Sequence, residues 1–292
     1  MKKTIHILLA MLLLSGLFAT AQIKPIKRNQ SSKSKTEQTK NKKSSNSTRA
    51  NSSSQKNQSS SNRSVPAVVR HVMDDMVYVE GDTFTMGGGH EKYTLIGLIH
   101  QVKLSSFYIS KYEVTQELWQ AVMGKNPSHF KGDLRRPVEQ VSWNDCQVFI
   151  TRLNQLTGKH FRLPTEAEWE FAARGGKQSL GYKYAGSNDI NNVAWIKDNS
   201  GEKTHPVGQK TPNELGLYDM SGNVDEWCQD WFGEFSEEGQ TNPAGPNSGS
   251  ARVQRGGSFN FDESECRVYW RRMNDPSEAY YRLGLRLAAS SL

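Results

Sequence analysis

The chain divides into three stretches with different patterns of apolar and polar residues. Two lysines and an apolar run, ending in small residues at Ala21, predict a secretory signal over 1–21; a retained anchor is the alternative. Residues 22–64 are mostly Ser, Asn, Lys and Gln. A segment without apolar side chains cannot offset the entropy lost on ordering, which predicts a disordered linker. Residues 65–292 are long enough for one domain with a sizeable core.

Strand patterns dominate the start of this domain. Met76–Glu80 and Thr83–Gly87 are β-rich runs on either side of a Gly-Asp turn, and they predict a β-hairpin. Residues 101–109 predict a third strand.

Three helices are predicted from capping signals. Thr115 caps a helix that ends at Gly124, and Ser142 opens a capping box for a helix that ends at Gly158. Thr165 opens a second capping box, for a helix that runs to about residue 174. The middle helix places one apolar stripe toward the core: Trp143, Cys146, Phe149, Ile150, Leu153 and Leu156.

The region 178–257 has no regular period. It is rich in Gly, Asn, Asp and Pro, and four of the seven tryptophans lie between Trp195 and Trp270. So many aromatic residues argue against disorder, and an unstructured loop of this length is unusual in a compact domain. We therefore expect ordered loops that have their own aromatic core. Loops of this kind are often held by a bound metal ion.

Charge is distributed unevenly between linker and domain. The chain has 37 basic and 30 acidic residues, of which the signal holds two basic residues and the linker eleven basic and one acidic. The remaining 24 basic and 29 acidic residues give residues 65–292 a net charge of −5, so the domain gives no reason to expect nucleic acid. The basic linker could contact anionic envelope surfaces or serve as a solvated tether.

The three cysteines, Cys146, Cys228 and Cys266, match no zinc-binding spacing. An exported protein permits disulfides, and an odd count leaves at least one thiol unpaired in the monomer. Cys146 belongs to the apolar stripe. Pairing of Cys228 with Cys266 stays open.

Several ordered motifs carry a family resemblance. They are YEVTQELW at 112–119, FRLPTEAEWEFAARGG at 161–176, NELGLYDMSGNVDEW at 213–227, RGGS at 255–258 and LGLRLA at 283–288. Together they resemble the formylglycine-generating enzymes, or sulfatase-modifying factors, over roughly residues 70–290. The resemblance implies a single α+β domain related to C-type lectins, with little regular secondary structure.

The resemblance also implies structural calcium. The carried-over ligands of the first site are Asp219, Gly222, Val224 and Glu226, the middle two through their carbonyl oxygens. Two carboxylates and carbonyls from a tight loop are the hard oxygen ligands that calcium prefers. A second site is expected near Asn192 and Val193, with later ligands around 198–201.

The resemblance implies a copper site, but this chain has only one of its two thiols. The family's enzymes bind copper(I) between two thiolates, soft ligands that suit this ion. The second thiol falls on Cys266, whereas Phe261 replaces the first, so copper binding is not expected. Ser258 matches a serine near the enzymes' oxygen site, and its Gly-Gly-Ser motif also fits a turn requirement. Asp225 stands where many relatives have an aromatic residue beside the substrate groove, and we expect its carboxylate to alter what binds.

Three functions follow as hypotheses for an exported protein that is periplasmic, envelope-associated or secreted. The missing cysteine favours a non-enzymatic module that binds a protein, peptide or glycan. The alternatives are a divergent oxidase acting on sulfatase cysteine, and a structural part of an envelope complex such as the type IX secretion and gliding machinery.

Overall fold

The structure is a computed structural model that describes residues 65–88 and 98–292. The signal 1–21 and the linker 22–64 of the sequence analysis lie outside the described residues. The helices are α1 (Ala67–Arg70), α2 (Gln116–Met123), α3 (Trp143–Thr157), α4 (Glu166–Ala173) and α5 (Ile190–Val193). Three 3₁₀ turns accompany them, η1 (His71–Met73), η2 (Gly176–Gln178) and η3 (Glu263–Cys266).

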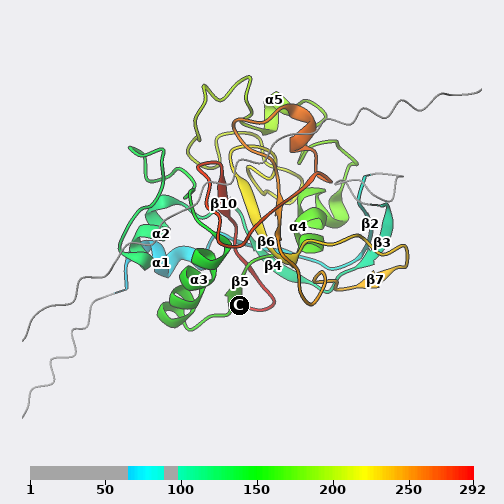
Figure 1. Cartoon of the computed structure of the whole chain (residues 1–292), viewed down its shortest axis with the longest axis horizontal. Coiled ribbons are helices and arrows are strands. Elements are labelled where there is room, and N and C mark those ends of the chain that lie inside the picture. The colour runs from blue at the N-terminus through cyan, green and yellow to red at the C-terminus, as the bar shows by residue number, and fades with distance from the viewer. Residues whose placement is uncertain (1–64, 89–97) are drawn as a thin grey trace, which may run out of the picture. The chain divides into compact units, whose positions relative to one another are not determined.

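Short strands form three small sheets. The first has the order β1 (Met76–Val79), β4 (Phe107–Ser110), β11 (Ala288–Ala289), β5 (Phe161–Arg162). The second has the order β10 (Leu283–Leu285), β6 (Asp225–Trp231), β8 (Arg252–Arg255), β9 (Arg271–Asn274). The third has the order β2 (Thr83–Met86), β3 (His100–Lys103), β7 (Gln240–Thr241). Helices α1, α2 and α3 gather on one side of β6 and β10, and the β2–β3–β7 sheet lies at the opposite end (Figure 1).

The predicted first hairpin is wrong, because β1 pairs with β4 and β2 pairs with β3, in different sheets. Gly81 explains the divergence. A Cβ on this residue would lie 2.3 Å from the carbonyl oxygen of Leu104, so the chain after β1 packs against the segment that joins β3 to β4. The single strand predicted over 101–109 is accordingly two strands.

The capped helices agree with the sequence. Ser142 and Thr165 each accept a hydrogen bond from the backbone three residues on and complete capping boxes. Gly124 and Gly158 end α2 and α3 with left-handed φ angles of 77° and 68°. The apolar stripe of α3 is buried except at its ends, where Leu156 is 41% exposed. No helix among the described residues combines the length and the apolar character needed to cross a membrane.

A buried ion pair joins the middle of the fold. Glu226 of β6 accepts hydrogen bonds from Arg286 and from the indole of Trp169 in α4, and the side chains of Glu226 and Arg286 are completely buried. Arg286 also donates to the carbonyl oxygens of Ser110 and Tyr218. This network ties β4, β6, α4 and the chain after β10 to one another, and it fixes the loops that follow β8.

Candidate functional site

The turn after β8 places the Gly-Gly-Ser motif against β6. Gly256 and Gly257 have φ angles of 101° and 73°, which only glycine adopts without strain. The Gly257 N–H donates to Asp225, and a Cβ on Gly257 would lie 2.5 Å from the Cys266 sulfur. The motif is thus needed for the turn itself, in agreement with the turn interpretation.

Cys266 lies beneath this turn and has no access to solvent. It packs in an apolar cluster with Tyr184, Ile196 and Val193, and burial raises the pKa of its thiol far above the ordinary value. A protonated, enclosed thiol is a poor nucleophile and a poor metal ligand, because the thiolate performs both roles. The environment of Cys266 is that of a packing residue.

Phe261 fills the position of the missing thiol. Its ring packs against the apolar cluster that contains Cys266. The guanidinium groups of Arg272 and Arg282 lie 3.7 and 4.8 Å from its centroid, in cation–π contact. Aromatic packing and cations replace a soft-ligand pair, and one buried thiol does not fit a copper(I) site.

Asp225 does not face solvent, and the expectation that its carboxylate alters what binds stays a prediction. Its side chain is buried, and its carboxylate forms a 2.8 Å ion pair with Arg282. Burial raises the pKa of Asp225 to about 6, and the nearby Arg282 partly opposes this shift. Asp225 therefore orients the Arg282 side chain and the Gly257 turn through these two contacts.

Ser258 is also buried, and its role is positional. Its hydroxyl donates a 2.8 Å hydrogen bond to the Asn260 side chain. The Asn260 amide in turn lies 3.5 Å from the Tyr281 hydroxyl. Ser258 thus orients a polar group at the edge of the adjacent surface cleft.

An aromatic cleft of about 500 Å³ opens beside these residues, and the sequence analysis did not anticipate it. Its rings form a connected set, with Phe130 and Phe259 centroids 5.1 Å apart and Tyr281 5.9 Å from Phe259. Tyr281 is 45% exposed. The full lining, hereafter the aromatic cleft, is His129, Phe130, Lys197, Glu202, Phe259, Asn260 and Tyr281.

The aromatic cleft is built from four separate loops, which is why a linear pattern did not reveal it. Glu139 holds one of them, because its carboxylate accepts a 2.8 Å hydrogen bond from the Phe130 N–H. Burial raises the pKa of Glu139 to about 7. The only sequence signal for the aromatic cleft was the position of Phe259 and Tyr281 beside the Gly-Gly-Ser and Leu-Gly-Leu-Arg motifs.

The expected first calcium ligands surround the Glu226–Arg286 pair. Asp219 is 2% exposed, and a positive φ of 58° fixes its position in the loop before β6. Gly222 approaches the backbone so closely that a Cβ would lie 2.4 Å from the Trp195 carbonyl oxygen. Val224 is buried and donates its N–H to Glu113.

The charges of this loop fit a cation. Burial, and then the neighbouring carboxylates of Asp219 and Glu226, raise the pKa of Glu113 well above its usual value. The three buried acids share the buried cation Arg286, and Lys210 also acts on Asp219. Asp219 Oδ1 is buried and has no partner among the described residues, while burial raises the Asp219 pKa to about 6. Within residues 65–88 and 98–292, however, side chains alone gather no set of three metal ligands, so the site would depend on carbonyl oxygens.

The expected second calcium site shows fewer features. The carbonyl oxygen of Asn192 accepts a 2.9 Å hydrogen bond from the Thr211 N–H. Val193 is buried in the Cys266 cluster, and Asp198 is exposed. This site stays a prediction.

All three cysteines are free and buried. Cys146 and Cys228 belong to two larger core clusters, whereas Cys266 belongs to the small cluster under Phe261. A Cys228–Cys266 disulfide is therefore absent, and each of the three thiols packs in an apolar cluster.

Comparison with known proteins places this geometry in context. Residues 61–291 match the sulfatase-modifying factor enzyme 1-like domain. The Paenibacillus barcinonensis protein named chaperone protein LppX is 37% identical over 64% of this chain and 79% of its own length. The formylglycine-generating enzyme of Streptomyces coelicolor is 39% identical over 55% of each chain, so this chain spans about half of that enzyme's length.

Solved structures agree. Treponema denticola variable protein 1 aligns with a TM-score of 0.69 at 36% identity, over 74% of this chain and 94% of its own. PvdO from Pseudomonas aeruginosa aligns with a TM-score of 0.63 at 27% identity over the same shares. The predicted α+β, formylglycine-generating-enzyme-like fold is confirmed. The chain belongs to the sulfatase-modifying factor enzyme 1-like domain family.

Proposed function

We propose that this chain is an exported binding module that holds a peptide segment of a partner protein in the aromatic cleft, without copper-dependent oxidation of cysteine. The proposal rests on the residues that stand where the family resemblance puts the two thiols. Phe259 and Asn260 of the exposed aromatic cleft come just before Phe261, which stands where the family resemblance puts the first thiol, and Cys266, at the position of the second, is enclosed.

The chemistry of the aromatic cleft suits a peptide. Exposed aromatic side chains such as Tyr281 supply large contact area at low entropic cost, and they are enriched in protein interfaces. Lys197, Glu202 and Asn260 add a cation, an anion and an amide, which can pair with side chains and backbone of an extended chain. One relative is itself named a chaperone, in line with polypeptide binding.

A peptide-display selection on the full chain, run beside a glycan array, tests this proposal. We expect enriched peptides whose affinity falls about tenfold in Tyr281→Ser, because an exposed aromatic anchor is removed. Tyr78→Ser is the matched control, since Tyr78 is 54% exposed and does not line the aromatic cleft. Peptides that bind both variants equally would overturn the assignment, and glycan binding that depends on Tyr281 would replace the ligand class.

We also propose one structural calcium ion at Asp219, Gly222, Val224 and Glu226. The unpartnered Oδ1 of Asp219 and the excess of buried carboxylates support it. When bound, calcium would neutralise buried charge and fix the loop that leads into β6. Export rests on the signal predicted over 1–21, and fractionation of the native host would test it.

A further inference from the structure

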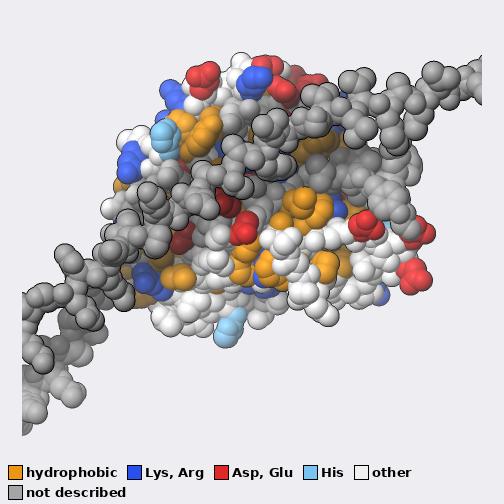
Figure 2. All heavy atoms as spheres, viewed as in Figure 1, with side chains coloured by type: hydrophobic (Ala, Val, Ile, Leu, Met, Phe, Trp, Pro, Cys, Tyr) orange, Lys and Arg blue, Asp and Glu red, His pale blue; other side chains and the backbone are white. Residues whose placement is uncertain are grey.

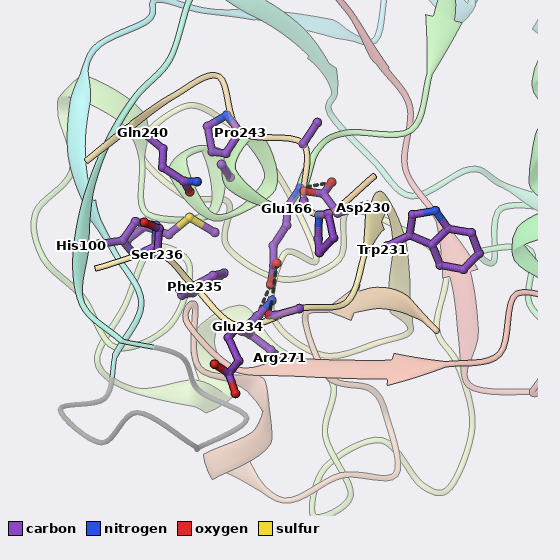
Figure 3. A pocket seen from close by; sticks show the side chains of 16 residues that line it. His100, Glu166, Asp230, Trp231, Glu234, Phe235, Ser236, Gln240, Pro243 and Arg271 are labelled. Atoms are coloured by element: carbon purple, nitrogen blue, oxygen red, sulfur yellow. Dashed lines mark hydrogen bonds and ion pairs between the residues drawn. The ribbon is translucent and has the colours of Figure 1, made fainter. Parts of the chain in front are cut away.

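A second pocket, of about 340 Å³, shares no lining residue with the aromatic cleft or the calcium loop. Residues of β2, β3, β7, α4 and β9 line it together with the loop after β6 (Figure 3). Its volume is within the range of small-molecule sites. The lining is mixed, with His100, Glu166, Asp230, Glu234 and Arg271 as its titratable residues.

The single cation of this pocket is already neutralised. Arg271 donates two hydrogen bonds, of 2.5 and 2.7 Å, to the carboxylate of Glu166, and both side chains are nearly fully buried. The Arg271 guanidinium also lies 3.8 Å from the Phe235 centroid. Arg271 thus lines the pocket with its charge already paired, and it would bind an incoming anion weakly.

His100 presents an unused acceptor. It is 4% exposed, and its Nδ1 lies 3.0 Å from the Leu98 carbonyl oxygen, so Nδ1 donates to that oxygen and Nε2 is the acceptor of the neutral ring. That Nε2 is buried and has no partner among the described residues. The ring stacks beside Phe235, with centroids 4.7 Å apart. A ligand donor would give this buried nitrogen the hydrogen-bond partner that it lacks.

Asp230 and Glu234 supply the remaining acceptors. Asp230 is 3% exposed; its Oδ2 accepts a 2.9 Å hydrogen bond from the Glu166 N–H, and within the described part of the chain Oδ1 accepts none. Glu234 is exposed at the rim of the pocket. His100 and the carboxyl groups of Asp230 and Glu234 thus line one pocket, whose lining cation, Arg271, is already paired with Glu166.

We propose that this pocket binds a primary alkylammonium group, such as a small amine. An ammonium has three donors and one positive charge, which suit the Nε2 of His100, the carboxyl oxygens of the lining and the excess of acidic over basic lining residues. The aromatic and proline residues of the lining cover the alkyl chain.

The surrounding surface favours the same ligand. Acidic side chains gather at the end of the molecule where β2, β3 and β7 lie, the end that contributes to the pocket (Figure 2). Such a field raises the local concentration of cations and lowers that of anions.

The protonation of Asp230 predicts a second measurable effect of amine binding. Burial, and then the charge of Glu166, raise the pKa of Asp230 to about 8. The charged groups around it are Glu166 and Glu168 of α4, Arg271 of β9 and Arg252 of β8. An ammonium ion favours the ionised carboxylate, so binding at pH 7 releases a proton. Calorimetry in buffers of different ionisation enthalpy measures that release.

Isothermal titration of the full chain with hexylamine, hexanol and hexanoate tests the proposal. We expect hexylamine to bind with a stoichiometry of one and at least about tenfold more tightly than the other two, because charge-assisted hydrogen bonds distinguish it. Hexanoate or hexanol binding as tightly as hexylamine would overturn the proposal.

Matched variants locate the site. His100→Phe keeps the stacking on Phe235 and removes the acceptor, and it should weaken hexylamine about tenfold. Glu234 is exposed at the rim, so Glu234→Gln should fold normally and should weaken hexylamine binding about threefold. Glu117 is exposed and does not line the pocket, so Glu117→Gln should leave hexylamine binding unchanged. Equal affinity in wild type and Glu234→Gln, with proton release absent, would place the amine elsewhere and refute the assignment.

Discussion

At the scale of single residues, Phe261 and Cys266 separate family membership from family chemistry. The family resemblance alone assigns both positions, after a turn whose two glycines have positive φ angles, and their roles stay predictions. The sequence could not give the burial of Cys266 or the arginines over Phe261, since these depend on chain segments far apart. For the same reason it could not give the ion pair of the buried Asp225 with Arg282.

Thiol labelling tests the packing role of the cysteines. In the folded chain at pH 8, a disulfide reagent should leave all three thiols unmodified, because they are buried and their pKa values are raised by burial. In guanidinium chloride all three should react. Rapid labelling of Cys266 in the folded protein would restore it as a reactive residue.

Asp230→Asn tests the buried carboxyl of the amine pocket. Because burial raises the Asp230 pKa from 3.8 to about 8, the native state holds a proton that the unfolded state releases across this window. Stability should therefore fall as pH rises from 4 to 8. The asparagine variant keeps the hydrogen bond from Glu166 and lacks this loss, so its stability advantage over wild type should grow from pH 5 to 8 and then level off in urea unfolding. A constant difference would contradict the account.

At the scale of elements, local signals predicted the helices well and the strand pairing poorly. Ser142, Thr165 and the two terminal glycines act within a few residues of the helix ends, so the sequence contains their effect. The pairing of β1 with β4 depends instead on the close approach of Gly81 to a distant backbone. The aromatic cleft was missed because it combines loops in the same non-local way.

Glu170 tests how the elements are joined. Its carboxylate binds Arg174, Arg255 and the Gly87 N–H, which links α4 to β8 and to the end of β2. Burial alone would raise its pKa, but Arg255 and Arg174 outweigh burial and lower it. Its contribution is therefore present above the unfolded pKa and is lost as pH falls through the folded value.

Glu170→Gln should destabilise the fold by roughly 3 kcal/mol at pH 7, because it removes the charge that lies against the buried guanidinium of Arg255. The difference from wild type should shrink toward low pH in denaturant titrations. Glu80→Gln, at the exposed pair with Lys177, is the matched control and should change little. A small effect of Glu170→Gln at pH 7 would show that the link is dispensable.

At the scale of the whole molecule, the family fold carries two separate surface pockets, the aromatic cleft and the pocket around Asp230, which have no lining residue in common. The loops between them depend on the Glu226–Arg286 network more than on regular secondary structure. Calcium at Asp219 would act on the same network. Calcium should thus raise the thermal midpoint of the full chain, and EDTA should reverse the rise.

Asp219→Asn should abolish this calcium effect, whereas Asp275→Asn, at an exposed turn, should preserve it. A midpoint that does not respond to calcium in wild type would remove the metal from the account, while leaving the fold and both pockets unaffected.

The most direct test of the central claim is the mass of a Cys-x-Pro-x-Arg peptide after incubation with the full chain, copper(I) and oxygen. The account predicts an unchanged peptide, because Phe261 removes one thiol and Cys266 is enclosed. Conversion of the cysteine to formylglycine, abolished in Cys266→Ser, would contradict it and make this chain a divergent oxidase.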